Sequence, residues 1–79
     1  MEQNNNELVY INFIEITRET EKAICIRIQA TTFDYTVWVP KSQVNEIKDN
    51  NVRLPKWLAK RVLFGEDYQK AKRYSGRSW

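Results

Sequence analysis

The sequence predicts a small α+β domain, in which four to five short antiparallel strands form a curled sheet or partly open barrel and a C-terminal helix closes one side. Three observations carry this prediction. Residues 33–39 alternate apolar and polar side chains, which is the period of a half-buried strand, and Pro40 ends the alternation. Two further segments rich in β-branched residues precede it at short spacing. After Pro55 the apolar spacing changes to that of an amphipathic helix.

Length and composition predict one domain, residues 1–79. A chain of 79 residues buries about 60–65% of its unfolded surface, so its core is small, and the ten aromatic residues compensate with large apolar areas. Cys25 is the single cysteine and histidine is absent. These counts rule out an intrachain disulfide, argue against a structural zinc site and remove the usual general base. We therefore expect no cofactor, no metal and no enzymatic activity.

Neither a membrane span nor a signal peptide is visible in the sequence. No apolar run approaches the ~20 residues that a spanning helix needs, and the first six residues are polar. We expect a cytoplasmic protein with no membrane association, and we expect residues 1–6 and 75–79 to be flexible.

The first predicted strand covers residues 8–16, a segment rich in β-branched and aromatic side chains. Its alternation slips near residues 12–15, where the apolar side chains change face. A bulge, or burial of both faces, would explain the slip. The polar residues 17–21 that follow predict the first turn.

Two more strands are predicted at residues 22–30 and 33–39, with a turn at residues 30–32 between them. Ile24, Ile26 and Ile28 share the inward face of the earlier strand. Because the connections between the three strands are short, an antiparallel meander is favoured.

Residues 41–55 allow two interpretations. Ser42 could cap a short helical turn, or residues 43–47 could form a fourth strand. Residues 48–51 (Lys-Asp-Asn-Asn) are a strong turn signal, and residues 52–54 would then form a fifth strand that pairs back on the fourth. We prefer this hairpin.

The C-terminal third predicts a helix that starts at Pro55, where the missing N–H of proline costs nothing. Gly65 is expected to stop or kink it, and residues 67–74 to form a second helical piece. The arrangement as a whole is of the kind seen in OB and SH3-like folds. The predicted core consists of Val9, Ile11, Phe13, Ile24, Ile26, Ile28, Tyr35, Val37, Val39, Val44, Ile47, Leu54, Trp57, Leu58 and Val62.

Charge is distributed unevenly along the chain, whose net charge is +3. Residues 1–21 carry a net charge of −4, and residues 56–79 carry +5. Two interpretations are open: the two ends pair with each other, or the C-terminal third presents a cationic face to an anion.

Trp38 and Lys41 form the first candidate site. Trp38 points opposite to the apolar face of its strand, which places it on the outer face of a sheet or at a barrel mouth. There it suits stacking on a nucleotide base or anchoring a protein partner. The alternative is that Trp38 packs beneath the C-terminal helix, because most tryptophans are largely buried.

The cations near the C-terminus form the second candidate. Residues 70–79 interleave lysine and arginine with Tyr74 and Trp79, a mixture that suits single-stranded nucleic acid. Lys56 and Lys60 are like charges one helical turn apart, so a partner for that face is plausible. In both places the alternative is a merely solvated surface.

Catalysis finds no support in the remaining polar residues. Glu15, Glu19 and Glu21 lie around the predicted first turn, where acid–base chemistry would require them to converge and be partly buried. The only glycines are Gly65 and Gly76, so no glycine-rich phosphate loop is present.

Residues 19–62 resemble a group of small proteins common in phages and mobile elements. The segments that carry the resemblance are Glu21-Lys22-Ala23-Ile24, then Trp38-Val39-Pro40-Lys41-Ser42-Gln43-Val44, then Leu54-Pro55-Lys56-Trp57-Leu58-Ala59-Lys60. The resemblance implies a phage, prophage or plasmid accessory protein. It implies no activity and makes no residue a site.

The leading functional hypothesis is a non-enzymatic accessory protein that binds nucleic acid, preferably single-stranded, through a basic and aromatic surface. The alternative is a phage-encoded inhibitor or adaptor that occludes a host protein, such as a defence nuclease, and a third possibility is a homo-oligomer that uses an exposed strand edge. The candidate binding residues are Trp38, Lys41, Lys56, Lys60, Arg61, Lys72, Arg73, Tyr74 and Arg77.

Overall fold

The computed structural model describes residues 7–75, and the ends at 1–6 and 76–79 lie outside the described residues. Ser75, which we expected to belong to a flexible end, is the last residue of a helix. The elements in order are β1 (Leu8–Asn12), β2 (Glu15–Glu19), β3 (Ala23–Gln29), β4 (Asp34–Pro40), a 3₁₀ turn η1 (Lys41–Gln43), β5 (Glu46–Lys48), β6 (Asn51–Pro55), α1 (Lys56–Phe64) and α2 (Glu66–Ser75).

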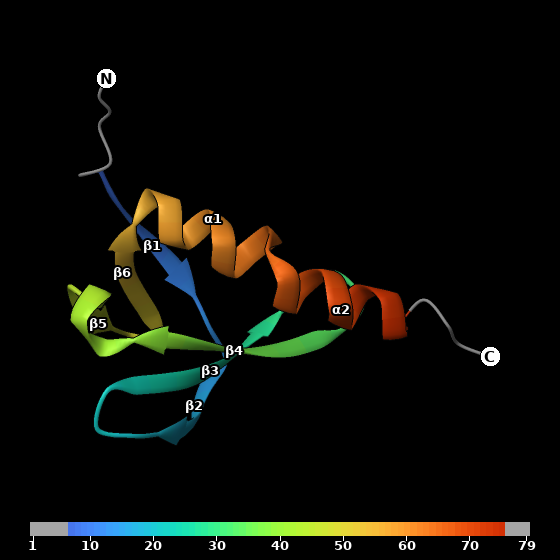
Figure 1. Ribbon diagram of the computed structural model, residues 1–79, viewed down its shortest axis with the longest axis horizontal. Helices are drawn as coiled ribbons and strands as arrows, with labels where there is room; N and C mark the ends of the chain where they lie inside the picture. Colours follow the sequence, from blue (N-terminus) through green and yellow to red (C-terminus); the bar gives the residue numbers. More distant parts are fainter. Residues whose placement is uncertain (1–6, 76–79) are drawn as a thin grey trace.

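The α+β class is confirmed, but the predicted single sheet of four to five strands is wrong. Within residues 7–75 six antiparallel strands form two three-stranded sheets, with orders β1-β6-β5 and β2-β3-β4, and they do not close into a barrel. Figure 1 shows the β2-β3-β4 sheet below and α1 and α2 above, with β1 and β6 beside the start of α1.

The chain passes from one sheet to the other at Phe13 and Ile14. The N–H of Phe13 donates to the carbonyl of Asn50 at 2.9 Å, beside the first sheet, and the next N–H, of Ile14, donates to Arg27 of the second sheet at 2.7 Å. The slip in apolar alternation at residues 12–15 is therefore a change of sheet. Strands that bend from one sheet into another make the corners of such packings. A bulge is present further on, at Thr17, between the pairs Ile16–Ile26 and Arg18–Cys25.

The antiparallel meander of three strands is confirmed as β2-β3-β4, but residues 17–19, which we expected in the first turn, belong to β2. After Pro40 the structure has both a short helical turn and the preferred hairpin, although Pro40 and not Ser42 is the N-cap residue of the turn. The short turn η1 is followed by the β5–β6 hairpin. Asp49 and Asn50, at its tip, have φ values of 50° and 63°. Positive φ at both central residues is what a two-residue hairpin loop of type I′ requires, and aspartate and asparagine tolerate it better than most residues.

Helix α1 starts one residue after Pro55, which is its N-cap residue. Leu58, Ala59 and Val62 face the interior. Each residue turns an α-helix by about 100°, so Trp57 lies on the side opposite to these three. Its placement in the predicted core is wrong, because its side chain is 44% exposed.

Gly65 ends α1 as predicted and separates it from α2. A Cβ at this position would lie 2.1 Å from the carbonyl oxygen of Arg61. That oxygen accepts the N–H of Gly65 at 2.8 Å, so the backbone approach leaves no room for a side chain.

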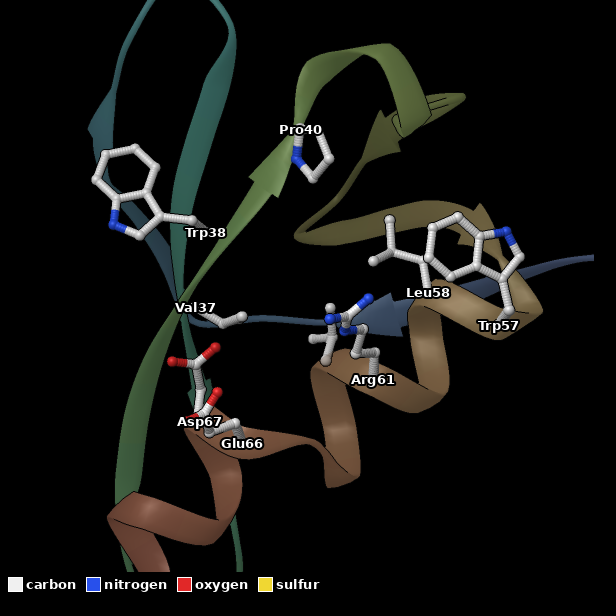
Figure 2. Close-up of a pocket in the computed structure, with 9 residues that line it drawn as sticks. Val37, Trp38, Pro40, Trp57, Leu58, Arg61, Glu66 and Asp67 are labelled. Carbon is white, nitrogen blue, oxygen red and sulfur yellow. The ribbon is translucent and has the colours of Figure 1, made fainter.

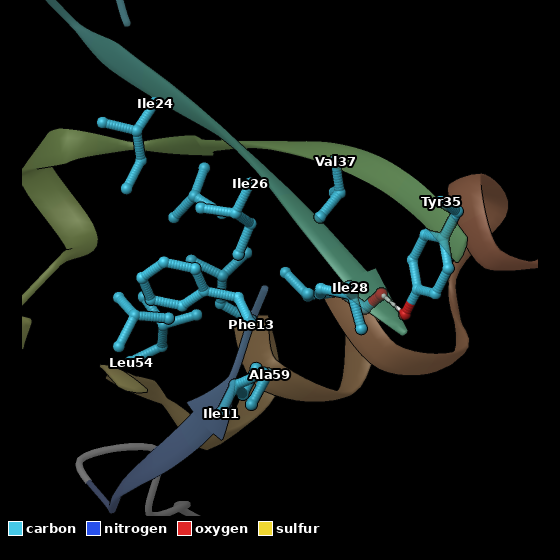
Figure 3. Close-up of a cluster of buried hydrophobic side chains, with 13 residues drawn as sticks. Ile11, Phe13, Ile24, Ile26, Ile28, Tyr35, Val37, Leu54 and Ala59 are labelled. Atoms are coloured by element: carbon cyan, nitrogen blue, oxygen red, sulfur yellow. Dashed lines mark hydrogen bonds between the residues drawn. The ribbon is translucent and has the colours of Figure 1, made fainter. Parts of the chain in front are cut away.

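The core lies between the two sheets and α1, as Figure 3 shows for the isoleucines of β3 and the residues that face them. Ile26, Val39, Val52 and Leu54 are fully buried. Most of the predicted core is confirmed, Val9 and Val44 are partly buried against it, and Ile47 is a second error with 45% exposure. It lies on the three-residue edge strand β5, whose side chains are all exposed.

Candidate functional site

Trp38 lies on the outer face of the β2-β3-β4 sheet with 47% of its side chain exposed. The alternative that it packs beneath the C-terminal helix is wrong, because Figure 2 shows its ring directed away from α1. Its cross-strand partner is Cys25, which pairs in turn with Arg18. Trp38 therefore shares a row of the sheet with one exposed cation, Arg18, and its ring is directed away from α1.

Lys41 and Lys56 are paired with acidic residues from the N-terminal part of the chain. The Nζ of Lys41 lies 2.6 Å from the Oε2 of Glu19, and the Nζ of Lys56 lies 3.4 Å from the Oε1 of Glu7. Exposed pairs of this kind contribute about 0–1 kcal/mol to stability. Their electrostatic effect here is to neutralise two of the predicted phosphate contacts, as the first of the two charge interpretations expects.

Four exposed residues form a continuous line along α1: Trp57, Lys60, Arg61 and Phe64, which we call the helix stripe. Their spacing of i, i+3, i+4 and i+7 places them on one face. Trp57 is 44% and Phe64 is 66% exposed, which is unusual for aromatic side chains of this size. Neither Lys60 nor Arg61 forms an ion pair with another described residue.

Helix α2 carries exposed Lys72 and Arg73. The stripe meets α2 at Tyr68, whose ring centre lies 6.2 Å from that of Phe64. The Lys72 ammonium lies 5.9 Å from the centre of the Tyr68 ring, within the range of a cation–π contact. The side chain of Tyr74 and all of Arg77 lie outside the described residues, so the structure does not place these two candidates.

A groove of about 330 Å³ lies between the helices and the part of β4 that contains Val37, Trp38 and Pro40. Val37, Leu58 and Val62 line its apolar part, and Arg61 extends from α1 into the same space (Figure 2). Two carboxylates, of Glu66 and Asp67, lie close to Val37 at one end. We call this space the β4–α1 groove; Trp57 and Arg61 line it and also belong to the helix stripe.

Tyr35 fixes the helices against β4. Its hydroxyl donates to the carbonyl of Val62 at 3.0 Å, and burial raises the pKa of Tyr35 to about 12. Its ring packs against Tyr68 of α2 at a centroid distance of 5.7 Å, with Phe33 completing the cluster. Tyr35 therefore holds α1 and α2, which carry the helix stripe and one wall of the groove, in place against β4.

A polar cluster separate from the helix stripe and the groove lies on the outer face of the β1-β6-β5 sheet. The Tyr10 hydroxyl donates to Glu46 at 2.8 Å, and this hydrogen bond raises the pKa of Tyr10. Arg53 lies over the Tyr10 ring at 5.5 Å and 3.9 Å from the Glu46 carboxylate. The three side chains contact one another, which is the behaviour of a structural cross-strand cluster.

The exposed aromatic residues of α1 are what the sequence analysis missed. Pro55 fixes the start of the helix, and counting about 100° per residue from there would have separated Trp57 from Leu58, Ala59 and Val62. The same count would have placed Phe64 beside Trp57 and Arg61.

Within residues 7–75, no group of three histidine, cysteine, aspartate or glutamate side chains converges as metal ligands would. Glu15 and Glu19 are paired with Arg27 and Lys41. Neither described helix has the length and apolar character needed to cross a bilayer.

Comparison of the chain with protein-family models, with curated proteins and with solved structures finds no match. The resemblance to small phage and mobile-element proteins stays a prediction.

Proposed function

We propose that this protein binds single-stranded nucleic acid, without catalysis, through the helix stripe of α1 and the adjoining cations of α2. The observation that carries the proposal is the exposure of Trp57 and Phe64 on one helix face, with Lys60 and Arg61 between them. Bases stack on aromatic rings whatever their sequence, and cations between the rings contact the phosphates. Lys72 and Arg73 extend the cationic surface, and Lys41 and Lys56 join it only when an anion displaces Glu19 and Glu7.

The proposal is tested by comparing alanine variants of two tryptophans that are almost equally exposed. Trp57 lies on the helix stripe and Trp38 on the outer face of the sheet. Stacking on one base contributes about 1–3 kcal/mol, so Trp57→Ala should weaken binding of a fluorescein-labelled oligothymidylate about 5- to 150-fold. Trp38→Ala is the matched control and should change the affinity by less than about twofold. The measurement is fluorescence anisotropy at low salt.

The opposite pattern is also informative. If Trp38→Ala abolishes binding and Trp57→Ala does not, the nucleic acid lies on the outer face of the sheet and the helix stripe is not the contact surface. If neither variant binds more weakly than the unmodified protein, the stacking proposal is wrong.

The second candidate function is occlusion of a host protein by a phage or mobile-element protein in the host cytoplasm. The observation that favours it is the large exposed aromatic area beside Arg61, because tryptophan and arginine dominate protein-interface hot spots. A pull-down from nuclease-treated host lysate tests it. A host protein retained by the unmodified chain and lost with Phe64→Ala would favour this function, and retention only before nuclease treatment would favour nucleic acid.

At the level of topology, we propose that the two sheets form a partly open barrel of the OB or SH3 type. The support is the bent segment that runs through β1 and β2 and is shared by both sheets. An experimental structure in which β1 and β2 lie in one flat sheet would contradict this.

A further inference from the structure

Strand β4 has a free edge that faces the β4–α1 groove. It is the last strand of its sheet. The N–H of Ala30 donates to Phe33 at 2.7 Å at one end of the β3–β4 ladder, and the N–H of Lys41 donates to Lys22 at 2.8 Å at the other. These two bonds fix which residue pairs of the ladder exchange hydrogen bonds.

Bonded and non-bonded pairs alternate in an antiparallel ladder. The pairs Ile28–Tyr35, Ile26–Val37 and Ile24–Val39 are therefore the bonded ones. The backbone groups of Thr36 and Trp38 point the other way, from the free edge, and they form no backbone hydrogen bond to another described residue outside the ladder. The edge thus presents two donors and two acceptors, and Pro40 ends the series because it has no N–H.

The other edge of this sheet is a poor docking site by comparison. Every side chain of β2 is exposed, and Glu15, Arg18 and Glu19 are charged, which is a common protection against unwanted strand pairing. At β4 the side chains facing the groove are apolar, and the opposite wall is a helix. A groove between a strand edge and a helix is a geometry in which proteins bind an extended peptide as an added strand.

We propose that the β4–α1 groove binds an extended peptide segment of a partner protein as an added strand, with an apolar and a basic side chain two positions apart facing the groove. This goes beyond nucleic-acid binding and gives the second candidate function a surface. The proposal rests on the free backbone groups of Thr36 and Trp38 and on the charges that line the groove.

The charges decide which peptide fits. Alternate residues of an added strand face the same side and lie about 6.7 Å apart. One such side chain would contact Leu58 and Val62, and the next would reach the end at which Glu66 and Asp67 lie beside Val37. Glu66 already pairs with Lys70 at 3.6 Å, whereas Asp67 forms no ion pair within the described part of the chain. The carboxylate of Asp67 is therefore available to a lysine or arginine of the peptide, and the donors of Arg61 to one of its carbonyl oxygens.

A synthetic peptide with the sequence SVSKSVS and blocked ends is the probe. Its three alternate side chains, valine, lysine and valine, face one side, and the sequence reads the same in both directions. The order of its side chains therefore does not depend on the strand direction. We expect a Kd below about 1 mM by titration calorimetry, and binding at least about tenfold weaker when glutamate replaces the lysine.

Variants of the protein separate the contributions of the backbone and of charge. Thr36→Pro removes one outward N–H and leaves the bonded pairs with β3 in place, so it should abolish binding, whereas Thr36→Ala keeps the N–H and should bind normally. Asp67→Asn should reduce the preference for the lysine peptide over the glutamate peptide to less than about threefold. Because Asp67 is exposed, this variant tests the proposal even if Thr36→Pro fails to fold, which circular dichroism would reveal.

Three results would overturn the proposal. The first is equal binding of the lysine and glutamate peptides, and the second is no binding of either at about 1 mM. The third is a dimer, detected by light scattering, that Thr36→Pro dissociates, since a second copy would then occupy the edge. None of the three depends on whether the helix stripe itself binds nucleic acid.

Discussion

The hydroxyl of Tyr35 is the smallest feature on which the arrangement of the helices depends. It is buried and donates to the carbonyl of Val62 in the last turn of α1, while its ring contacts Tyr68 of α2. One side chain of β4 therefore contacts both helices that carry the candidate surface.

Tyr35→Phe removes this hydrogen bond and leaves a buried carbonyl without that donor. We expect a loss of about 1 kcal/mol in the free energy of unfolding, measured by urea denaturation near pH 8. The ring of residue 35 keeps its contact with Phe33 in the variant. A change in packing should therefore contribute little to the loss of stability.

The stability difference between the unmodified protein and Tyr35→Phe should depend on pH. An unfolded tyrosine loses its proton near pH 10, whereas the folded state holds the pKa of Tyr35 at about 12. Because the folded state binds the proton more tightly, this contribution to stability is complete below pH 10 and is lost as the pH rises toward 12. The stability difference between the unmodified protein and Tyr35→Phe should therefore shrink between about pH 10 and about pH 12; a constant difference would contradict the assignment.

The two tryptophans of the candidate surfaces illustrate what single positions reveal in the sequence. The outward position of Trp38 follows from strand alternation, which has a period of two and leaves little ambiguity. The direction of Trp57 relative to Leu58, Ala59 and Val62 follows from about 100° per residue wherever the helix starts. Its exposure was therefore open to prediction, and the error was to count Trp57 in the core with Leu58 and Val62.

At the scale of elements, Gly65 is the junction between α1 and α2. The structure places the Arg61 carbonyl where a Cβ would have to lie, so the two helices can be adjacent only with glycine at this position.

Gly65→Ala should destabilise the protein by about 1–3 kcal/mol, because backbone atoms must move to relieve the overlap. Gln69→Ala, on an exposed position of α2, is the control and should change stability by less than about 0.5 kcal/mol. Thermal unfolding followed by circular dichroism measures both; equal melting temperatures for the two variants would mean that the junction is not constrained.

The strands show which elements could be predicted and which could not. Residues 23–29 and 34–40 alternate cleanly, and their pairing follows from the short turn between them. The positive φ values at Asp49 and Asn50 agree with the turn residues found there. The division of residues 8–19 between two sheets was not predictable, because the irregular alternation also fits a bulge. It results from the contacts of Phe13 and Ile14 with strands that are distant in the sequence.

At the scale of the whole molecule, ion pairs neutralise some of the positively charged residues, and others stay unpaired on one helix face. The acidic N-terminal part pairs with Lys41 and Lys56, as one interpretation of the sequence expected. The cations of the helix stripe have no such partner within residues 7–75, as the other interpretation expected. Neutralisation of a cation in the C-terminal third depends on its distance from the acidic residues near the N-terminus. The sequence alone does not give these distances.

The salt dependence of oligonucleotide binding tests the central proposal most directly. For a single strand, the logarithm of the affinity falls with the logarithm of the salt concentration with a slope of about −0.7 per phosphate contact. The double variant Lys60→Gln/Arg61→Gln should therefore bind oligothymidylate more weakly and reduce the magnitude of the slope by about 1.4. The double variant Lys22→Gln/Lys48→Gln removes the same charge from exposed positions elsewhere and should leave the slope within about 0.3 of the unmodified value. An unchanged slope for the helix-stripe variant, or no binding by the unmodified protein at about 50 mM salt, would contradict the account.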